Sequence, residues 1–193
     1  MEITDETIDV LLSALADQLQ ALGSQAELVV IGGSALITLG LVKRATRDVD
    51  LLAIAANGEL RPAEPLPEPL LAARAAVATD FGLAETWLNA GPTDLLTWGL
   101  PEGFMSRVVT RSYGRTLVVH FAGRLDQIHF KLFAVVDQGG GRHEADLRAL
   151  SPTRGELVAA ARWSMTQDMS PGYRSVLEDA LHVLGVDDAD LGA

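Results

Sequence analysis

Hydrophobic residues recur at two different spacings along the first third of the chain, and these spacings predict alternating helices and strands. A helical stripe runs through residues 5–22 and ends at Gly23. Continuous apolar runs at 27–32 and 48–55 are typical of buried strands, and the short apolar segment 34–41 between them is predicted to be helical.

The middle of the chain is less regular. The proline-rich stretch RPAEPLPEPLL interrupts the pattern, because proline can continue neither a helix nor a central strand. A helix is predicted at about 69–79, and residues 84–104 are predicted to be irregular. The segment RVVTRSYGRTLVVHFA predicts a β-hairpin that turns at Gly114.

The helical spacing returns after Arg124 and is interrupted by three consecutive glycines at 139–141. Thr153 and Glu156 have the spacing of a capping box, so a helix is predicted from there through Trp163. A last amphipathic helix is predicted at 173–184.

Together these elements predict an α/β (α+β) fold with a small mixed sheet flanked by helices. We expect a core over residues 1–150 and a C-terminal helical segment over 151–193 that packs on it. The chain has 193 residues, of which 48% are hydrophobic, and this is enough for a buried core without disulfides.

Composition narrows the functional classes. The absence of cysteine excludes thiolate chemistry and cysteine-type zinc sites, and it fits a reducing cytoplasm. The acidic start MEITDETIDVLL does not resemble a secretory signal, and no apolar run reaches the roughly 20 residues that cross a bilayer. We therefore expect a soluble cytoplasmic protein with no membrane partner. The net charge of −11 argues against a general nucleic-acid coat protein, but not against an enzyme that grips one RNA end.

The first strand leads into Gly32-Gly33-Ser34, and the second strand opens with Asp48-Val49-Asp50. Because side chains alternate along a strand, both aspartates are expected on one face, with Val49 in the core. Two adjacent carboxylates need a cation, which is either a divalent metal or a neighbouring arginine. A glycine turn before a helix can hold a phosphate, or it can be an ordinary turn. A phosphate cradle beside a divalent-metal site is what phosphoryl or nucleotidyl transfer requires.

This stretch also carries a family resemblance. It is similar to the first motif of minimal nucleotidyltransferases of the DNA-polymerase-β superfamily, and more narrowly to the AbiEii/MenT branch, in which a GG pair precedes R-x-T-x-D-[IV]-D. The matching residues are Gly32, Gly33, Ser34, Ala35, Arg44, Thr46, Asp48, Val49 and Asp50. Trp87-Leu88-Asn89 resembles a further segment of such proteins. Ala90 stands where relatives often have aspartate, so Asn89 is assigned no role.

The family's second region is a helical lysine followed by a basic residue and an aspartate, and IHFKLFAVVDQGGGRHEADLRAL offers Lys131, Arg142 and Asp146. The resemblance implies that Lys131 holds the nucleotide phosphates; on its apolar helix it would otherwise be a surface lysine. Asp146 would support a metal, orient Lys131 or accept the proton of the attacking hydroxyl. Glu144-Ala145 alter the usual basic–acidic pair before it.

Many members of the superfamily have a third carboxylate on a later strand, and the corresponding stretch TLVVHFAG has none. Asp146 and Asp126 are the candidates to replace it, and the alternative is a site with fewer metal ligands. His120 lies on this strand between Val119 and Phe121, and we expect it to be a core histidine with polar partners.

The resemblance implies an enzyme that moves a nucleoside monophosphate from an NTP to an acceptor with Mg²⁺ or Mn²⁺. It further implies an RNA acceptor such as the tRNA 3′ end, and a toxin that is paired with an antitoxin protein. Asp48, Asp50, Lys131 and Asp146 would be catalytic, and the two strand aspartates would bind the metal. The substrate-binding residues would be Gly32, Gly33, Ser34, Arg44, Thr46 and Arg142. The alternatives are the same chemistry on a protein or small molecule, and a catalytically silent binding module.

Overall fold

The computed structural model describes residues 2–191, and the chain divides into two compact units. Unit 1 contains the described residues up to Gly99 together with Met105–Ala122. Unit 2 contains Leu100–Phe104 and the described residues from Gly123 onward. Among the described residues no helix is both long enough and apolar enough to cross a membrane.

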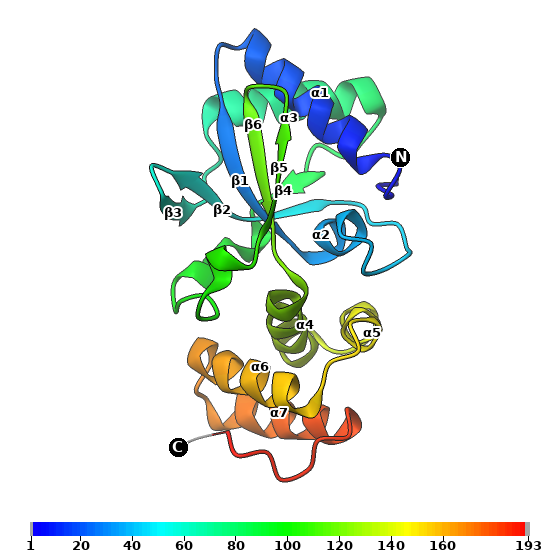
Figure 1. The fold of residues 1–193 in the computed structure, drawn as a ribbon, viewed down its shortest axis with the longest axis vertical. Coiled ribbons are helices and arrows are strands. Elements are labelled where there is room, and N and C mark those ends of the chain that lie inside the picture. Colours follow the sequence, from blue (N-terminus) through cyan, green and yellow to red (C-terminus); the bar gives the residue numbers. More distant parts are fainter. Residues whose placement is uncertain (1, 192–193) are drawn as a thin grey trace. The chain divides into compact units, whose positions relative to one another are not determined.

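Unit 1 is built on one mixed sheet, which confirms the predicted α/β class (Figure 1). Its strands are β1 (Ala26–Ile31), β2 (Val49–Ala56), β3 (Glu59–Pro62), β4 (Leu88–Asn89), β5 (Val109–Tyr113) and β6 (Leu117–Phe121). The order is β3-β2-β1-β6-β5, and β4 pairs with the first residues of β2, beyond the end of β3. β1 runs parallel to β6 and antiparallel to β2, and β5 and β6 form the predicted hairpin.

Helices α1 (Ile8–Ala21) and α3 (Glu68–Phe81) lie side by side on one face of this sheet (Figure 1). The core between them contains leucines of α1, alternate residues of β1 such as Leu28 and Val30, and Phe121 of β6. The short helix α2 (Gly32–Thr38) follows β1 directly, and the 3₁₀ helix η1 (Gly91–Leu96) also belongs to unit 1. The 3₁₀ helix η2 (Phe104–Ser106) crosses the division between the units at Phe104 and Met105.

Unit 2 is helical and consists mainly of α4 (Arg124–Gln138), α5 (Arg142–Ala149), α6 (Arg154–Gln167) and α7 (Pro171–Val183). Helix α4 contacts the other three. The predicted capping box is present: the Thr153 hydroxyl accepts from Glu156 N–H at 3.2 Å, and Glu156 Oε2 accepts from Thr153 N–H at 2.8 Å. The indole of Trp163 packs edge-on against Phe130 and Phe133 of α4.

The structure differs from the sequence predictions in the connections. The proline-rich stretch begins with the end of β3, and the supposedly irregular residues 84–104 contain β4 and η1. Both strands, β3 and β4, pair with the edge of β2. They therefore form because of long-range strand pairing and not because of a local hydrophobic pattern. The boundary between the compact units lies at Ala122–Gly123, so α4 and α5 group with the later helices, whereas the sequence analysis grouped them with the core.

Candidate active site

The glycine bend lies directly against the acidic strand. β1 ends at Ile31, and Gly32 turns the chain into α2 with φ of 73°. A Cβ atom at Gly32 would overlap the carboxylate of Asp50. A Cβ at Gly33 would lie 2.9 Å from Arg44 Nη2 and 3.0 Å from Thr46 Oγ1. The two glycines are therefore required because the backbone passes against residues that the sequence motif contains.

The two aspartates occupy the predicted positions at the start of β2. Val49 is fully buried in the core, whereas Asp48 and Asp50 are half-buried. Asp50 pairs with Ile31 across the sheet, which places it beside the bend. The Thr46 hydroxyl donates to Asp48 Oδ1 at 3.1 Å, so a motif threonine orients the first carboxylate.

Asn89, to which sequence reasoning assigned no role, contacts the acidic strand. Its Nδ2 donates to Asp50 Oδ1 at 3.1 Å, and its own Oδ1 accepts from Gly91 N–H at 2.9 Å. The register places it opposite Asp50, because β4 runs parallel to β2 and Val49 N–H donates to the carbonyl of Trp87 at 2.6 Å. The Trp87-Leu88-Asn89 segment was the available signal, and the buried indole of Trp87 anchors it.

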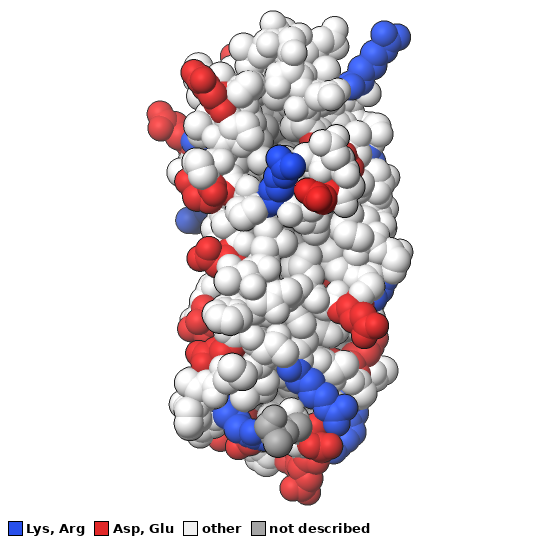
Figure 2. All heavy atoms as spheres, turned by 90° about the vertical axis from the view of Figure 1, so that its left-hand side faces the viewer, with Lys and Arg blue, Asp and Glu red and all other residues white. Residues whose placement is uncertain are grey.

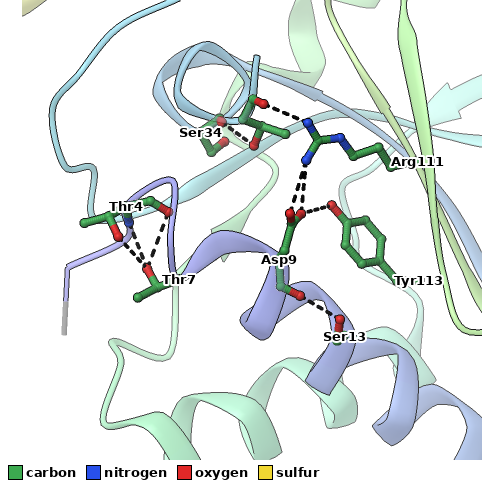
Figure 3. A network of polar contacts seen from close by, with 8 residues as sticks. Thr4, Thr7, Asp9, Ser13, Ser34, Arg111 and Tyr113 are labelled. Atoms are coloured by element: carbon green, nitrogen blue, oxygen red, sulfur yellow. Dashed lines mark hydrogen bonds and ion pairs between the residues drawn. The ribbon is translucent and has the colours of Figure 1, made fainter. Parts of the chain in front are cut away.

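Helix α2 is held at its far end by a polar network that the sequence did not reveal (Figure 3). Arg111 of β5 donates to Thr38 O at 2.9 Å and to Asp9 of α1 at 3.2 Å, and Tyr113 donates to Asp9 at 2.6 Å. The Thr38 hydroxyl in turn donates to Ser34 O at 2.8 Å. Burial and the hydrogen bond to Asp9 raise the pKa of Tyr113, so its hydroxyl remains a donor.

The hydroxyl of Ser34 is buried. Ser34 is fully enclosed in the first turn of α2, and its Oγ has no hydrogen-bond partner among residues 2–191. A buried hydroxyl without a partner costs free energy, and such groups are rare in folded proteins. The motif serine therefore retains hydrogen-bonding capacity beside the glycine bend.

Lys131 and Asp146 form a buried ion pair within unit 2. The Lys131 Nζ lies 2.8 Å from Asp146 Oδ2, and the two side chains are 6% and 2% exposed. Three roles were considered for Asp146, and this contact is the one expected if Asp146 orients Lys131. Arg142 is exposed at the start of α5, and Asp126 is fully buried in the first turn of α4.

His120 has polar partners, as predicted. It is 9% exposed on β6, with Nδ1 2.7 Å from Thr110 Oγ1 and Nε2 2.7 Å from Glu27 Oε1. Of the tryptophans, Trp87 is fully buried, whereas Trp98 is 65% exposed.

The carboxylate oxygens of Asp48 and Asp50 in unit 1 are suitable ligands for a hard divalent cation. In the part of the chain that the structure describes, no three histidine or acidic side chains gather to form a metal cage. Mg²⁺ is usually held by one or two carboxylates, with waters and substrate phosphates completing its shell. Asp48 and Asp50 supply two carboxylates, and that of Asp50 lies directly against the Gly32 backbone. The chemistry of this site therefore suits a metal that arrives with a phosphate ligand.

A family profile described as "nucleotidyltransferase of unknown function (DUF6036)" matches residues 10–139. The chain belongs to this nucleotidyltransferase family. The matched range includes the glycine bend, the acidic strand, Asn89 and Lys131, and it ends before Arg142. No curated protein and no solved structure matches the chain. The narrower resemblance to the AbiEii/MenT branch stays a prediction.

Proposed function

We propose that the glycine bend and the acidic strand of unit 1 form the site of a metal-dependent nucleotidyl transfer. The enzyme would move a nucleoside monophosphate from an NTP to an acceptor hydroxyl and release pyrophosphate. The observation that carries this proposal is the contact of the Gly32 backbone with the Asp50 carboxylate, because it joins a phosphate cradle and a metal ligand. Membership of a nucleotidyltransferase family gives the reaction class.

The chain's own residues would bind the triphosphate at the bend. The first N–H groups of a helix have no acceptor within the helix, and Gly32, Gly33 and Ser34 form the first turn of α2. Arg44 Nη2 lies beside Gly33, where its guanidinium can add charged donors to a phosphate. The Ser34 hydroxyl would gain a partner when a phosphate oxygen occupies the bend.

Asp48 and Asp50 would hold Mg²⁺ or Mn²⁺, which when bound neutralises charge on the phosphates. Thr46 donates to the Asp48 carboxylate and Asn89 donates to the Asp50 carboxylate. One oxygen of each aspartate is therefore positioned before the substrate arrives. Such supporting hydrogen bonds keep the ligands in place and lower the cost of forming the complex.

The second region adds proposals that rest on the family resemblance. Lys131 and Arg142 would supply positive charge to the nucleotide, and Asp146 would orient the lysine ammonium through their 2.8 Å ion pair. The finer proposals are an RNA acceptor, the tRNA 3′ end, and a toxin that is neutralised by an antitoxin protein. Lys and Arg side chains are interspersed with Asp and Glu side chains on the face in Figure 2, so this face offers no extended basic surface for a long nucleic acid.

The test is transfer of label from each of the four α-³²P NTPs, with Mg²⁺, to RNA and protein fractions of a cell extract. We expect label in an RNA band that is sensitive to nuclease and resistant to protease. Asp50→Asn should abolish transfer, whereas Asp80→Asn, an exposed carboxylate on α3, should not change it. Label in a protease-sensitive band would instead favour a protein acceptor. Equal transfer by both variants would refute the proposed site.

A further inference from the structure

A second polar cluster crosses three neighbouring strands of unit 1. His120 of β6 lies between Thr110 of β5 and Glu27 of β1, at 2.7 Å from each. The His120 side chain is 11% exposed, whereas Thr110 is exposed and the Glu27 side chain is 45% exposed. The cluster therefore has a buried base beside a hydroxyl that solvent can reach.

For a neutral imidazole, the hydrogen-bond partners of His120 determine which ring nitrogen carries the proton. An ionised carboxylate only accepts hydrogen bonds, so Nε2 carries the proton that Glu27 accepts. A neutral imidazole then has a lone pair at Nδ1, and the Thr110 hydroxyl donates to it. A hydroxyl that is bound to a base, with the base oriented by a carboxylate, is the arrangement that activates a nucleophile.

The cluster lies on the same face of the sheet as Asp50. His120 pairs with Val29 and Asp50 pairs with Ile31, two residues further along β1. Leu28 and Val30 belong to the core under α1 and α3, so the alternate residues point to the opposite face. Thr110 pairs with His120 and shares this face.

The distance excludes transfer within one molecule. Three strand spacings separate β2 from β5, which amounts to about 14 Å. A nucleotide held at Asp50 cannot place its α-phosphate on the Thr110 hydroxyl of the same chain across that distance. β5 is an edge strand, so a second copy can approach it.

We propose that Thr110 is a self-modification site that accepts the nucleotidyl group from an NTP held by a second copy of this chain. The inference rests on the proposed function. The Thr110 Oγ–Pα bond forms, the bond from Pα to the bridging oxygen of the β-phosphate breaks, and pyrophosphate leaves. The hydroxyl proton goes to His120 Nδ1, and Glu27 stabilises the resulting imidazolium through Nε2.

The experiment mixes active protein with a size-tagged Asp50→Asn copy, Mg²⁺ and labelled NTP. We expect label on the tagged copy, and peptide mass spectrometry should place the added nucleoside monophosphate on Thr110. Thr110→Val in the tagged copy should remove the label and Thr110→Ser should keep it. Ser112→Ala is the matched control, because Ser112 is an exposed hydroxyl on the same strand and should be dispensable.

Two further variants of the tagged copy test whether His120 and Glu27 activate the Thr110 hydroxyl. His120→Gln should slow labelling by at least about 100-fold, which is the typical lower contribution of a general base. Glu27→Gln keeps an oxygen that can accept from Nε2 but removes the charge. It should therefore leave the melting temperature unchanged and still slow labelling, which a purely structural role of this positioning residue would not produce.

The outcomes separate this inference from the proposed function. Label on RNA with none on the tagged copy would overturn the inference and leave the function standing. Label on the tagged copy that survives Thr110→Val would overturn the inference in the same way. If no acceptor is labelled and no pyrophosphate is released with any NTP, both are wrong.

Discussion

Gly32 and Asp50 restrict each other more than any other pair in the candidate site. Gly32 has a positive φ and no room for a Cβ, because the Asp50 carboxylate occupies that space. The sequence motif predicted the identity and position of both residues. It could not predict that Asn89 donates to Asp50, because that contact depends on the parallel pairing of β4 with β2.

Gly32→Ala should therefore damage both stability and activity. The left-handed backbone alone costs an alanine about 1–2 kcal/mol. Gly58→Ala is the matched control, since its φ is 80° and its Cβ would meet nothing within 4 Å. We expect the control to lose only that backbone cost and to keep full transfer activity. Urea unfolding and label transfer measure both effects, and equal losses in the two variants would contradict the contact.

The buried pair of Lys131 and Asp146 makes a second prediction about single side chains. Removing one partner leaves an uncompensated buried charge, so Lys131→Met and Asp146→Leu should each cost about 3–5 kcal/mol. The double variant should recover much of the loss in the unfolding free energy. Additive losses in this double-mutant cycle would show that the ion pair is not formed.

Helices and strands with strong local signals were predicted close to their observed positions. The capping box at Thr153 and Glu156 marked the start of α6 because both of its hydrogen bonds are local. β3 and β4 were missed because each is short and is stabilised by pairing with β2. The Arg111 network that holds the end of α2 was missed for the same reason, since it joins β5, α1 and α2.

The start of α6 should give unit 2 an acid-sensitive stability. Hydrogen bonds from Arg124 and from the Thr153 backbone lower the pKa of Glu156 from 4.5 to about 2. The ionised side chain therefore contributes stability above pH 4.5, and this contribution is lost as the pH falls towards 2. Urea midpoints between pH 6 and 2 should fall more steeply for the wild type than for Glu156→Gln. Parallel curves for the two proteins would rule out this pKa shift.

Across the protein, the residue pattern and the motif predicted the class of fold and a nucleotidyltransferase family; the structure confirms the fold class and the family match confirms the family. The division of the chain into units was harder to predict. The resemblance grouped helix α4, which contains Lys131, with the sheet, but its packing against α5, α6 and α7 places it in unit 2. Residues that belong to one sequence motif can therefore lie on elements that pack into different cores.

The central claim is that the acidic strand and the glycine bend together bind a metal–nucleotide complex, and a thermal shift measurement tests it most directly. A ligand that binds the native state raises the melting temperature. The wild type with both Mg²⁺ and the preferred NTP should melt higher than with either alone, and Asp50→Asn should lose this joint increase while Asp80→Asn retains it. No joint increase in the wild type with any NTP, or an equal increase in Asp50→Asn, would contradict the account.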